Sequence, residues 1–356
     1  MLSAIEEAER EILFEMYWFG SDRTGRRFAS ALAEKARAGV AVCVIYDAVG
    51  SIDADEAMFD ELRAAGCDVR QFNPIAPWRH RFNIGLVNNR DHRKIIVVDQ
   101  ARCLTGGVNA ADQWAPESEG GAGWRDDMIL IEGVAALRMR DVFLYTWREL
   151  GGKDPGPALT EAEMRRSHAE IPDEGSPVRV LASHYRAERA AIRRSYLQEI
   201  RRARSHIYIA NSYFVPDRVI RNSLAGAARR GVDVRVLLPG ENDVPAVQHA
   251  SRRLYGWLMK QGISLYEWQG TVLHAKTAVI DDRWCTVGTY NMDYRSWRAN
   301  LEVNVAVEDH GVAAALAERF RADLAGSVKV DPHDWGYRPL SDRLLQHFFY
   351  LFRKLL

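Results

Sequence analysis

Cysteine is scarce in this chain of 356 residues, which has only four. They are Cys43, Cys67, Cys103 and Cys285, and no two of them form the C-x-x-C pair that metal sites and redox centres use. Three lie in apolar, strand-like surroundings, so we expect buried, reduced thiols. The pattern argues against a small secreted fold held together by disulfides and favours a reducing compartment.

Long apolar runs and an excess of one charge are also missing. No stretch approaches the ~20 apolar residues that a membrane-spanning helix needs. The N-terminus, MLSAIEEAER, lacks the charged-then-apolar design of a signal peptide. The 48 basic and 48 acidic side chains cancel, which disfavours nucleic acid as a partner. We therefore expect a cytoplasmic protein that lies free or on a membrane surface.

One motif is present twice. The pattern H-x-K-x4-D comprises His92, Lys94 and Asp99 in its first copy and His274, Lys276 and Asp281 in its second. Each copy is followed after six residues by a glycine-led turn, which ends in Asn109 or in Asn291. Two copies with matched turns indicate a duplicated functional element and predict an enzyme whose active site has two similar halves.

The similarity extends through both halves of the chain. An apolar strand at 12–19 corresponds to one at 207–214, the helix pattern at 28–39 to that at 220–231, and the strand at 40–47 to that at 232–239. Strands that alternate with helices predict an α/β fold. We expect two similar α/β/α domains from an internal duplication, each a mixed β-sheet flanked by helices. Their expected bounds are 1–150 and 178–330, with a linker at 151–177 and a tail at 331–356.

Strand geometry divides the motif residues into two groups. Side chains alternate between the faces of a strand, so the histidine and the lysine of each copy share a face. The aspartate, five residues beyond the lysine, points to the other face if the strand stays regular. We therefore expect structural roles for Asp99 and Asp281.

The residue types favour metal-free attack on a phosphodiester. Lysines supply fixed positive charge, and asparagine amides donate hydrogen bonds to phosphoryl oxygens. One histidine can attack phosphorus while the other protonates the departing alkoxide. Each imidazole then needs a carboxylate on Nδ1. Aligning the last strands of the two halves matches Glu132 with Glu308 and sets Asp126 opposite Glu302, so the last two are the predicted carboxylates.

A metal site is the competing chemistry. Neither His92 nor His274 has a second histidine, cysteine or acidic residue at metal-ligand spacing, and a lysine two residues away opposes a cation. We expect no metal and no cofactor.

These motifs resemble those of the phospholipase D superfamily, and their amino-acid sequences are most similar to those of the bacterial cardiolipin synthases. The similar segments are RDHRKIIVVD, GGVN, WRDD, YFVPD, LHAKTAVIDD and VGTYNMDYRSWRANLE, and the resemblance covers the chain to about residue 330. It implies an active site at the domain interface and a covalent phosphohistidine intermediate. In that branch one phosphatidylglycerol is attacked, glycerol leaves, and the hydroxyl of a second phosphatidylglycerol gives cardiolipin.

The resemblance also implies roles for single residues. His92 is the expected nucleophile and His274 the general acid and then base, although the order of the two is open. Lys94, Lys276, Asn109 and Asn291 are expected to hold the phosphate, Asp126 and Glu302 to lie behind the histidines, and Gly107 and Thr289 to bind substrate. Thr289 stands where serine is common and keeps the hydroxyl. Since the chain starts almost at its first strand, we expect its membrane contact to come from a segment other than N-terminal membrane helices.

Two segments leave alternatives open. Residues 340–356 predict an amphipathic helix with a basic polar side, which either lies on an anionic membrane at the inner face of the cell membrane or packs on the core. Residues 73–89 precede the first motif without a counterpart in the second half. They form a surface excursion, or a loop that binds a head group through Arg79, His80 and Arg81.

Three further functions compete with cardiolipin synthesis. A hydrolase would release phosphatidic acid if water reached the phosphohistidine, and a nuclease would use the same motifs on DNA. A non-catalytic lipid-binding module is disfavoured because both histidines and both lysines are present.

Overall fold

The computed structural model describes residues 1–74, 88–169, 171, 175–183 and 189–355. The proposed head-group residues Arg79, His80 and Arg81 lie outside the described residues. By internal contacts the chain divides into two compact units. Unit 1 comprises Met1–Gly123, Met128–Gly175 and Asn300–Val303, and unit 2 comprises Trp124–Asp127, Ser176–Ala299 and Asn304–Leu356. Each unit therefore contains one short segment from the opposite half of the sequence.

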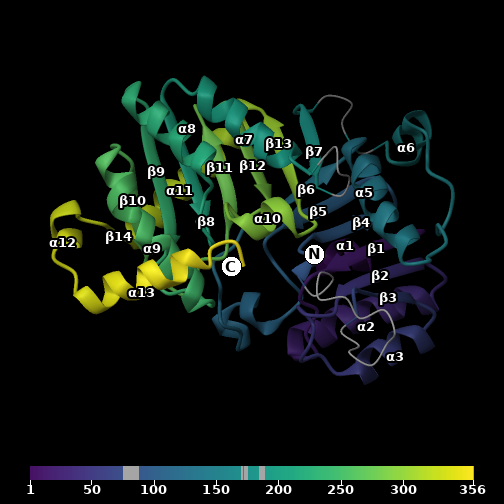
Figure 1. Cartoon of the computed structure of the whole chain (residues 1–356). Coiled ribbons are helices and arrows are strands. Elements are labelled where there is room, and N and C mark those ends of the chain that lie inside the picture. The colour runs from purple at the N-terminus through teal and green to yellow at the C-terminus, as the bar shows by residue number, and fades with distance from the viewer. Residues whose placement is uncertain (75–87, 170, 172–174, 184–188, 356) are drawn as a thin grey trace. The chain divides into compact units, whose positions relative to one another are not determined.

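Among its described residues, unit 1 holds a six-stranded mixed sheet in the order β3-β2-β1-β4-β5-β6 (Figure 1). The strands β1, β2 and β3 run parallel, and β4, β5 and β6 continue the sheet in antiparallel pairs. Their bounds are β1 (Glu11–Met16), β2 (Ala41–Asp47), β3 (Asp68–Phe72), β4 (Lys94–Val98), β5 (Arg102–Gly106) and β6 (Met128–Glu132).

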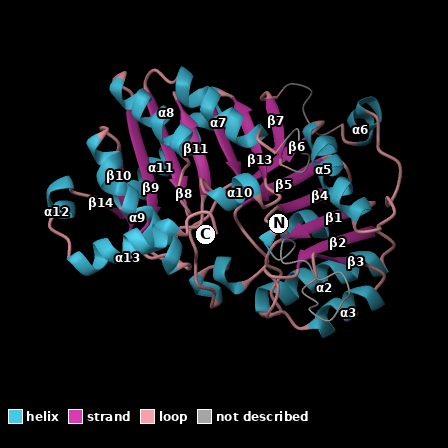
Figure 2. Ribbon diagram, in the orientation of Figure 1, coloured by secondary structure: helices cyan, strands magenta, loops and turns pink. Residues whose placement is uncertain are grey.

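Helices cover both faces of this sheet (Figure 2). They are α1 (Leu2–Glu6), α2 (Arg23–Arg37), α3 (Glu56–Ala64), α5 (Ala135–Glu149) and α6 (Glu161–Ser167), with short 3-10 turns η1 (Asp112–Trp114) and η2 (Glu117–Glu119). Strand β1 shows why two layers form, because its side chains alternate. Ile12 and Phe14 pack into an apolar cluster with α2 and α3, whereas Glu15 bonds to Arg93, which also contacts Thr146 of α5.

Unit 2 repeats this design with a longer sheet, which in the described residues has eight strands in the order β14-β10-β9-β8-β11-β12-β13-β7. Its parallel part is β8, β9 and β10, and β11, β12 and β13 continue in antiparallel pairs. The bounds are β7 (Val178–Ala182), β8 (His206–Asn211), β9 (Asp233–Pro239), β10 (Ser264–Trp268), β11 (Lys276–Ile280), β12 (Trp284–Gly288), β13 (Val303–Glu308) and β14 (Ser327–Lys329).

The helices of unit 2 also lie on two faces. They are α7 (Ala191–Arg202), α8 (Arg218–Arg229), α9 (Pro245–Lys260), α10 (Tyr294–Arg298), α11 (His310–Ala325), α12 (Pro332–Gly336) and α13 (Leu340–Leu351). Ile207 and Ile209 of β8 join the apolar cluster that includes α7, α8 and α9. Between them Tyr208 faces the opposite way and stacks on Phe320 of α11, with ring centroids 5.0 Å apart.

The strand register supports the expected duplication. In unit 1 Lys94 pairs with Met16 of β1, and in unit 2 Lys276 pairs with Asn211 of β8. The two antiparallel strands therefore meet the central parallel strand at matching positions. Two similar α/β units with mixed sheets confirm the predicted fold class.

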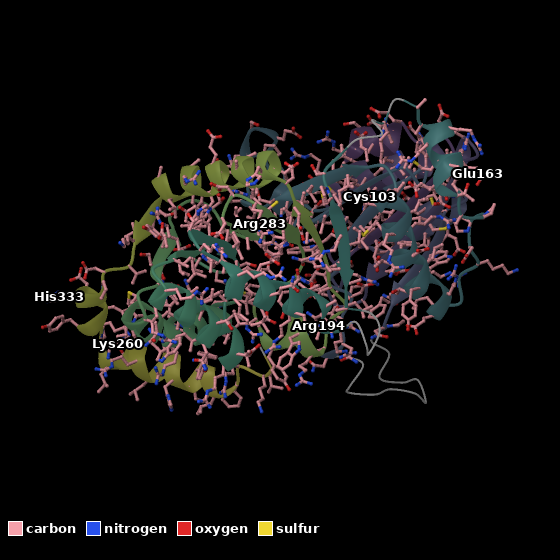
Figure 3. The ribbon with its side chains drawn as sticks, turned by 90° about the horizontal axis from the view of Figure 1, so that it is seen from above. Cys103, Glu163, Arg194, Lys260, Arg283 and His333 are labelled. Atoms are coloured by element: carbon pink, nitrogen blue, oxygen red, sulfur yellow. The ribbon has the colours of Figure 1, made fainter. Side chains whose placement is uncertain are left out.

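Two details add to the expected organisation. The expected linker 151–177 contains helix α6, which begins at a capping box in which Thr160 accepts a hydrogen bond from the Glu163 N–H and Glu163 accepts one from the Thr160 N–H. All four cysteines are free and buried, as predicted, and Cys103 is labelled in Figure 3. Burial raises the pKa of the Cys103 thiol to about 12, so the thiol form is favoured.

The motif aspartates do not continue their strands, which departs from the alternation assumed for them. Strand β4 ends at Val98, and Asp99 and Asp281 adopt left-handed backbone conformations with φ of 51° and 56°. Asp99 accepts hydrogen bonds from the N–H groups of residues 9, 10 and 11. Asp281 accepts three in the same way from residues 204, 205 and 206. Each carboxylate ties the turn after the motif strand to the start of the central parallel strand.

We predict that Asp281→Asn lowers the free energy of unfolding by about 2 kcal/mol at neutral pH, because three bonds to a charged acceptor are weakened. Burial raises the pKa of Asp281, but the backbone N–H groups outweigh burial and hold that pKa below its ordinary value of 3.8. Such a carboxylate contributes stability above its unfolded-state pKa and loses it as the pH falls through the folded-state pKa.

Urea unfolding at a series of pH values checks this. The difference between parent and variant should be constant near neutrality and should close below about pH 4. The exposed Asp53, changed to Asn, serves as the control and should show no difference. If the difference in the free energy of unfolding stayed the same at acid pH, the stabilisation would not depend on ionised Asp281.

Candidate active site

In unit 1 the His92 imidazole lies against a carboxylate from the short segment 300–303. Its Nδ1 is 3.1 Å from Oε2 of Glu302, and both side chains are buried. The backbone places them together, because the His92 N–H donates to the Leu301 carbonyl and the Leu301 N–H to the Arg90 carbonyl. Asn300 Nδ2 lies 3.4 Å from the other oxygen of Glu302. A carboxylate at Nδ1 accepts that proton and leaves Nε2 able to act as a nucleophile or base.

Lys94 is fully buried in unit 1 and its charge is stabilised locally. The ammonium donates to the His92 carbonyl at 2.7 Å. It also lies 4.9 Å from the centroid of the Tyr17 ring, which makes an edge contact with His92 at the same separation. Tyr17 therefore contacts both motif side chains, and a cation–π contact lowers the cost of burying the charge.

Asn109 follows strand β5 and lies buried near the end of β1. Its Oδ1 accepts a hydrogen bond from the Trp18 N–H at 3.0 Å, which orients the amide and leaves the Nδ2 group as the donor. Gly107 is buried two residues earlier, with its carbonyl 3.5 Å from Asn109 Nδ2. Backbone pairing thus fixes the direction of the amide side chain.

In unit 2 the His274 imidazole lies against a carboxylate from the segment 124–127. Its Nδ1 is 2.8 Å from Oδ2 of Asp126, and both side chains are buried. Lys276 Nζ is also within 3.0 Å of that nitrogen. Because Nδ1 cannot donate to a carboxylate and accept from an ammonium at once, we assign its proton to the shorter, charge-assisted contact with Asp126.

Lys276 has other partners for its charge. It donates to the hydroxyl of Ser212 at 2.9 Å and to the His274 carbonyl. Ser212 in turn donates to Oδ1 of Asn291 at 2.9 Å, so the lysine and the asparagine are joined through one hydroxyl. Thr289 is fully buried directly after β12. By strand register Ser212 stands where Tyr17 stands in unit 1.

The structure therefore groups the predicted residues within each unit. Unit 1 brings together His92, Lys94, Asn109 and Glu302, and unit 2 brings together His274, Lys276, Asn291 and Asp126. The carboxylates are exchanged, since each histidine pairs with a carboxylate from the other half of the sequence. Tyr17 and Ser212 were not predicted. Aligning the strands at 12–19 and 207–214 sets Tyr17 opposite Ser212, which was the available signal. In the structure each follows directly after its strand, which ends at Met16 or Asn211.

A buried ionic network underlies β4 in unit 1. Arg93, between the two motif residues, donates to Asp91 and to Glu15 at 2.5 Å. Burial raises the pKa of Glu15 well above its usual value, and the charge of Arg93 offsets this only in part. Burial also opposes ionisation of Asp91, but Arg93 and hydrogen bonds hold the pKa of Asp91 below its usual value. The charge of Asp91 adds to the rise in the pKa of Glu15, because both carboxyl groups lie at one guanidinium.

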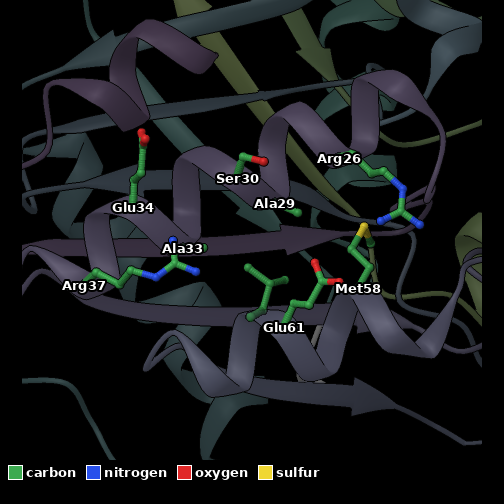
Figure 4. A pocket seen from close by; sticks show the side chains of 9 residues that line it. Arg26, Ala29, Ser30, Ala33, Glu34, Arg37, Met58 and Glu61 are labelled. Carbon is green, nitrogen blue, oxygen red and sulfur yellow. The ribbon is translucent and has the colours of Figure 1, made fainter.

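Among the described residues, neither a metal-ligand cluster nor the cavity between α2 and α3 involves a predicted site residue. Within the part of the chain that the structure describes, no three or more His, Cys, Asp or Glu side chains gather as metal ligands. A cavity of about 320 Å³ lies between α2 and α3 (Figure 4) and is lined by both acidic and basic side chains, including Arg26, Glu34, Arg37 and Glu61. It contains no residue of either motif.

The duplicated α/β fold with paired H-x-K motifs and a carboxylate on each imidazole defines a phospholipase D-like phosphoryl-transfer protein. A family model described as "Cardiolipin synthase, PLD-like domain" matches residues 1–120 and 196–324. The chain therefore belongs to the cardiolipin synthase family of phospholipase D-like proteins.

Curated relatives agree with this assignment. The chain is 32% identical over 356 residues to the probable cardiolipin synthase YwiE of Bacillus subtilis, and covers 69% of that protein. It is 34% identical over 357 residues to the cardiolipin synthase of Geobacillus kaustophilus, and covers 70% of it. All of this chain is matched in both. The crystal structure of phosphatidylserine synthase from Haemophilus influenzae has the same fold, with a TM-score of 0.75 at 15% identity over all of this chain and 92% of that one.

We predict that Glu302→Gln lowers turnover about 100-fold with little effect on the apparent affinity for lipid, because the imidazole loses the acceptor that fixes its tautomer. Steady-state kinetics on phospholipid vesicles measures both constants. Glu308→Gln is the matched control, since Glu308 is exposed and ends β13, the strand that begins directly after Glu302. Equal losses in both variants would show that the effect comes from the strand and not from the contact with His92.

Proposed function

We propose that the chain is a phosphatidyl transferase that joins two phosphatidylglycerols into cardiolipin and releases glycerol. The single observation that carries the proposal is the pair of buried histidines, each with a neighbouring lysine and a carboxylate at Nδ1, in a chain of the cardiolipin synthase family. The mechanism requires that the two histidines act on one phosphodiester.

In the first half of the reaction, His92 Nε2 attacks phosphorus of the donor lipid. A P–N bond forms and the bond from phosphorus to the glycerol oxygen breaks. The departing oxygen takes a proton from protonated His274, so glycerol leaves as a neutral alcohol. The phosphatidyl group is then held on His92 as a phosphohistidine.

The second half reverses these roles. The hydroxyl of a second phosphatidylglycerol gives its proton to His274, and its oxygen attacks phosphorus. The P–N bond breaks, cardiolipin forms, and both histidines return to their starting states. Lys94 and Lys276 stabilise the anionic phosphoryl oxygens, and Asn109 and Asn291 donate hydrogen bonds to them. Buried ammonium groups act strongly here, because little water screens them.

Mass spectrometry of lipids tests this proposal. The pure protein is incubated with phosphatidylglycerol vesicles in excess chelator, with His92→Ala as control. We predict that cardiolipin and free glycerol appear in equal amounts with the parent, and that the variant forms at least about 1,000-fold less.

Other products would assign another activity. Phosphatidic acid in place of cardiolipin means that water resolves the phosphohistidine, so the chain is a phospholipase. Loss of activity in chelator, restored by a divalent ion, would contradict the metal-free mechanism.

We also propose that the protein contacts the membrane through helix α13 and the residues after it, at the inner face of the cell membrane. In the described residues no helix combines the length and apolar character needed to cross a bilayer. The lipid substrates nevertheless lie in a membrane, so the protein needs a surface that meets one.

Both sides of α13 bear on this proposal. Tyr350 and the half-buried Phe349 pack on the core of unit 2 beside α9, where Phe349 stacks on His249 at 5.6 Å and Gln346 is buried. The predicted polar side thus supplies part of the docked face. The apolar side is left exposed and comprises Leu340, Leu344, Leu345, Phe348, Leu351, Phe352 and Leu355. A contiguous apolar surface of this kind is typical of a binding face.

Basic side chains occur on α13 and next to it, with Arg343 in the helix and Arg338 before it. Burial and the charges of Arg343 and Arg253 lower the pKa of Arg338, and the charge of Asp342 offsets this in part. Phosphatidylglycerol and cardiolipin are anionic, and an anionic surface attracts such basic side chains. Apolar insertion and charge therefore favour the same partner, an anionic bilayer.

We predict that the triple variant Leu344→Ser, Phe348→Ser, Leu351→Ser binds phosphatidylglycerol vesicles about 100-fold more weakly, since each residue contributes about 1 kcal/mol of apolar insertion. Vesicle flotation measures binding, and thermal unfolding should be unchanged because all three side chains are exposed. The control Ile52→Ser removes an exposed apolar residue elsewhere. Undiminished flotation of the triple variant would rule out this face as the membrane contact.

A further inference from the structure

The carboxylate that holds His274 comes from a segment with no helix or strand of its own. Residues Trp124–Asp127 belong to unit 2, whereas the residues on either side of them belong to unit 1. Asp126 nevertheless needs a fixed position, because a hydrogen bond to an imidazole weakens steeply with misalignment.

Backbone pairing sets the register of this segment. The Arg125 N–H donates to the Val272 carbonyl at 2.9 Å, and the His274 N–H donates to the Arg125 carbonyl at 2.7 Å. These two bonds bring Asp126 beside His274.

The Arg125 side chain holds the next peptide group, between Asp126 and Asp127. Its Nη1 donates to the Asp126 carbonyl at 2.7 Å and to Oδ1 of Asp127 at 2.7 Å. Its Nε and Nη2 donate to the carboxylate of Asp323 on α11, at 3.0 and 2.6 Å. Arg125 and Asp323 are both buried, so water competes little for these bonds.

The result is a carboxylate with both oxygens occupied. The Asp127 N–H donates to Oδ1 of Asp126 at 2.8 Å, and Oδ2 faces the His274 Nδ1 at 2.8 Å. Arg125 fixes the peptide group between Asp126 and Asp127, and also the Asp127 side chain. The N–H of that peptide group makes the first of these two bonds. A chain of contacts therefore runs from Asp323 through Arg125 to the orientation of Asp126.

In the part of unit 1 that the structure describes, the equivalent position does not form this clamp. Leu301 occupies that backbone position, since the His92 N–H donates to its carbonyl. The buried Arg93 of unit 1 lies instead on the segment of the motif itself and pairs with Glu15 and Asp91. The Arg125 clamp is thus a feature of the His274 side and not a requirement of the repeated fold.

We propose that Arg125, anchored by Asp323, is a positioning residue that orients Asp126 and through it the His274 imidazole. The role of His274 as acid and base rests on the proposed function. Arginine suits the task because its rigid, planar guanidinium holds several acceptors in a fixed geometry, whereas the donors of a lysine ammonium rotate about one point. Removing Arg125 alone would leave the buried carboxylate of Asp323 without its main cation, so a single variant would risk unfolding.

The test uses Arg125→Met combined with Asp323→Leu, which removes both charges at similar volume. With phosphatidylglycerol vesicles, kcat should fall about 10- to 100-fold while KM is unchanged, because orientation is lost and not lipid binding. Arg319→Gln is the control, since this exposed arginine lies 3.7 Å from the same carboxylate. It should leave both constants unchanged.

A double-mutant cycle with Asp126→Asn tests whether Arg125 affects kcat through Asp126. If Arg125 acts through Asp126, adding the clamp variant to Asp126→Asn costs little further activity. Additive losses, or an unchanged kcat in a folded clamp variant, would overturn the proposal.

Proton NMR at low field separates this proposal from the proposed function. The resonance of the His274 Nδ1 proton, assigned by its loss in His274→Gln, should be present in the parent and in Arg319→Gln. In the clamp variant it should shift or broaden. This holds even if the parent makes no cardiolipin, and an unchanged resonance would overturn the positioning role.

Discussion

The burial of two lysine ammonium groups is the constraint on which both half-sites depend. Lys94 and Lys276 are essentially inaccessible to water, and a buried charge is costly unless it is compensated. Each lysine donates to the carbonyl of the histidine two residues earlier, so the motif spacing itself supplies part of the compensation. Tyr17 adds to this compensation in unit 1, and Ser212 does so in unit 2. A site arranged in this way favours an anionic phosphodiester as its ligand.

Much of the fold and of the site was predictable because periodicity and motif spacing are local. The duplication, the mixed sheets and the grouping of histidine with lysine follow from alternation along strands. The pairing of each carboxylate with its histidine does not follow from alternation along strands. Alignment identified Asp126 and Glu302 but did not show which histidine each one contacts. Asp126 lies 148 residues from His274 and Glu302 lies 210 residues from His92, so these pairs depend on the path of the folded chain. The turn at Asp99 was missed for a related reason, since its left-handed backbone depends on bonds to residues 9–11.

In the C-terminal tail the sequence pattern predicted a helix but left open which side of that helix faces the core. Amphipathicity correctly indicated a helix near 340–351, and packing on the core and contact with a membrane stood as alternatives. The structure shows docking on α9, but through a side that includes Gln346 and Tyr350, while the more apolar side stays exposed. A helix that only stabilised the core would bury its most apolar side. The observed orientation therefore favours an external apolar partner, which the lipid substrates supply.

A duplicated fold gives two similar backbones, but the chemistry requires two different histidines. One must be unprotonated to attack phosphorus while the other is protonated to release the alkoxide. The structure provides differences at equivalent positions: Glu302 against Asp126 on the imidazole, Tyr17 against Ser212 beside the lysine. Arg93 is buried on the motif segment in unit 1, whereas Arg125 is buried on the exchanged segment in unit 2. Because a histidine's pKa follows its charged neighbours and their geometry, unequal surroundings are a physical means for equal motifs to take the unequal roles proposed for them.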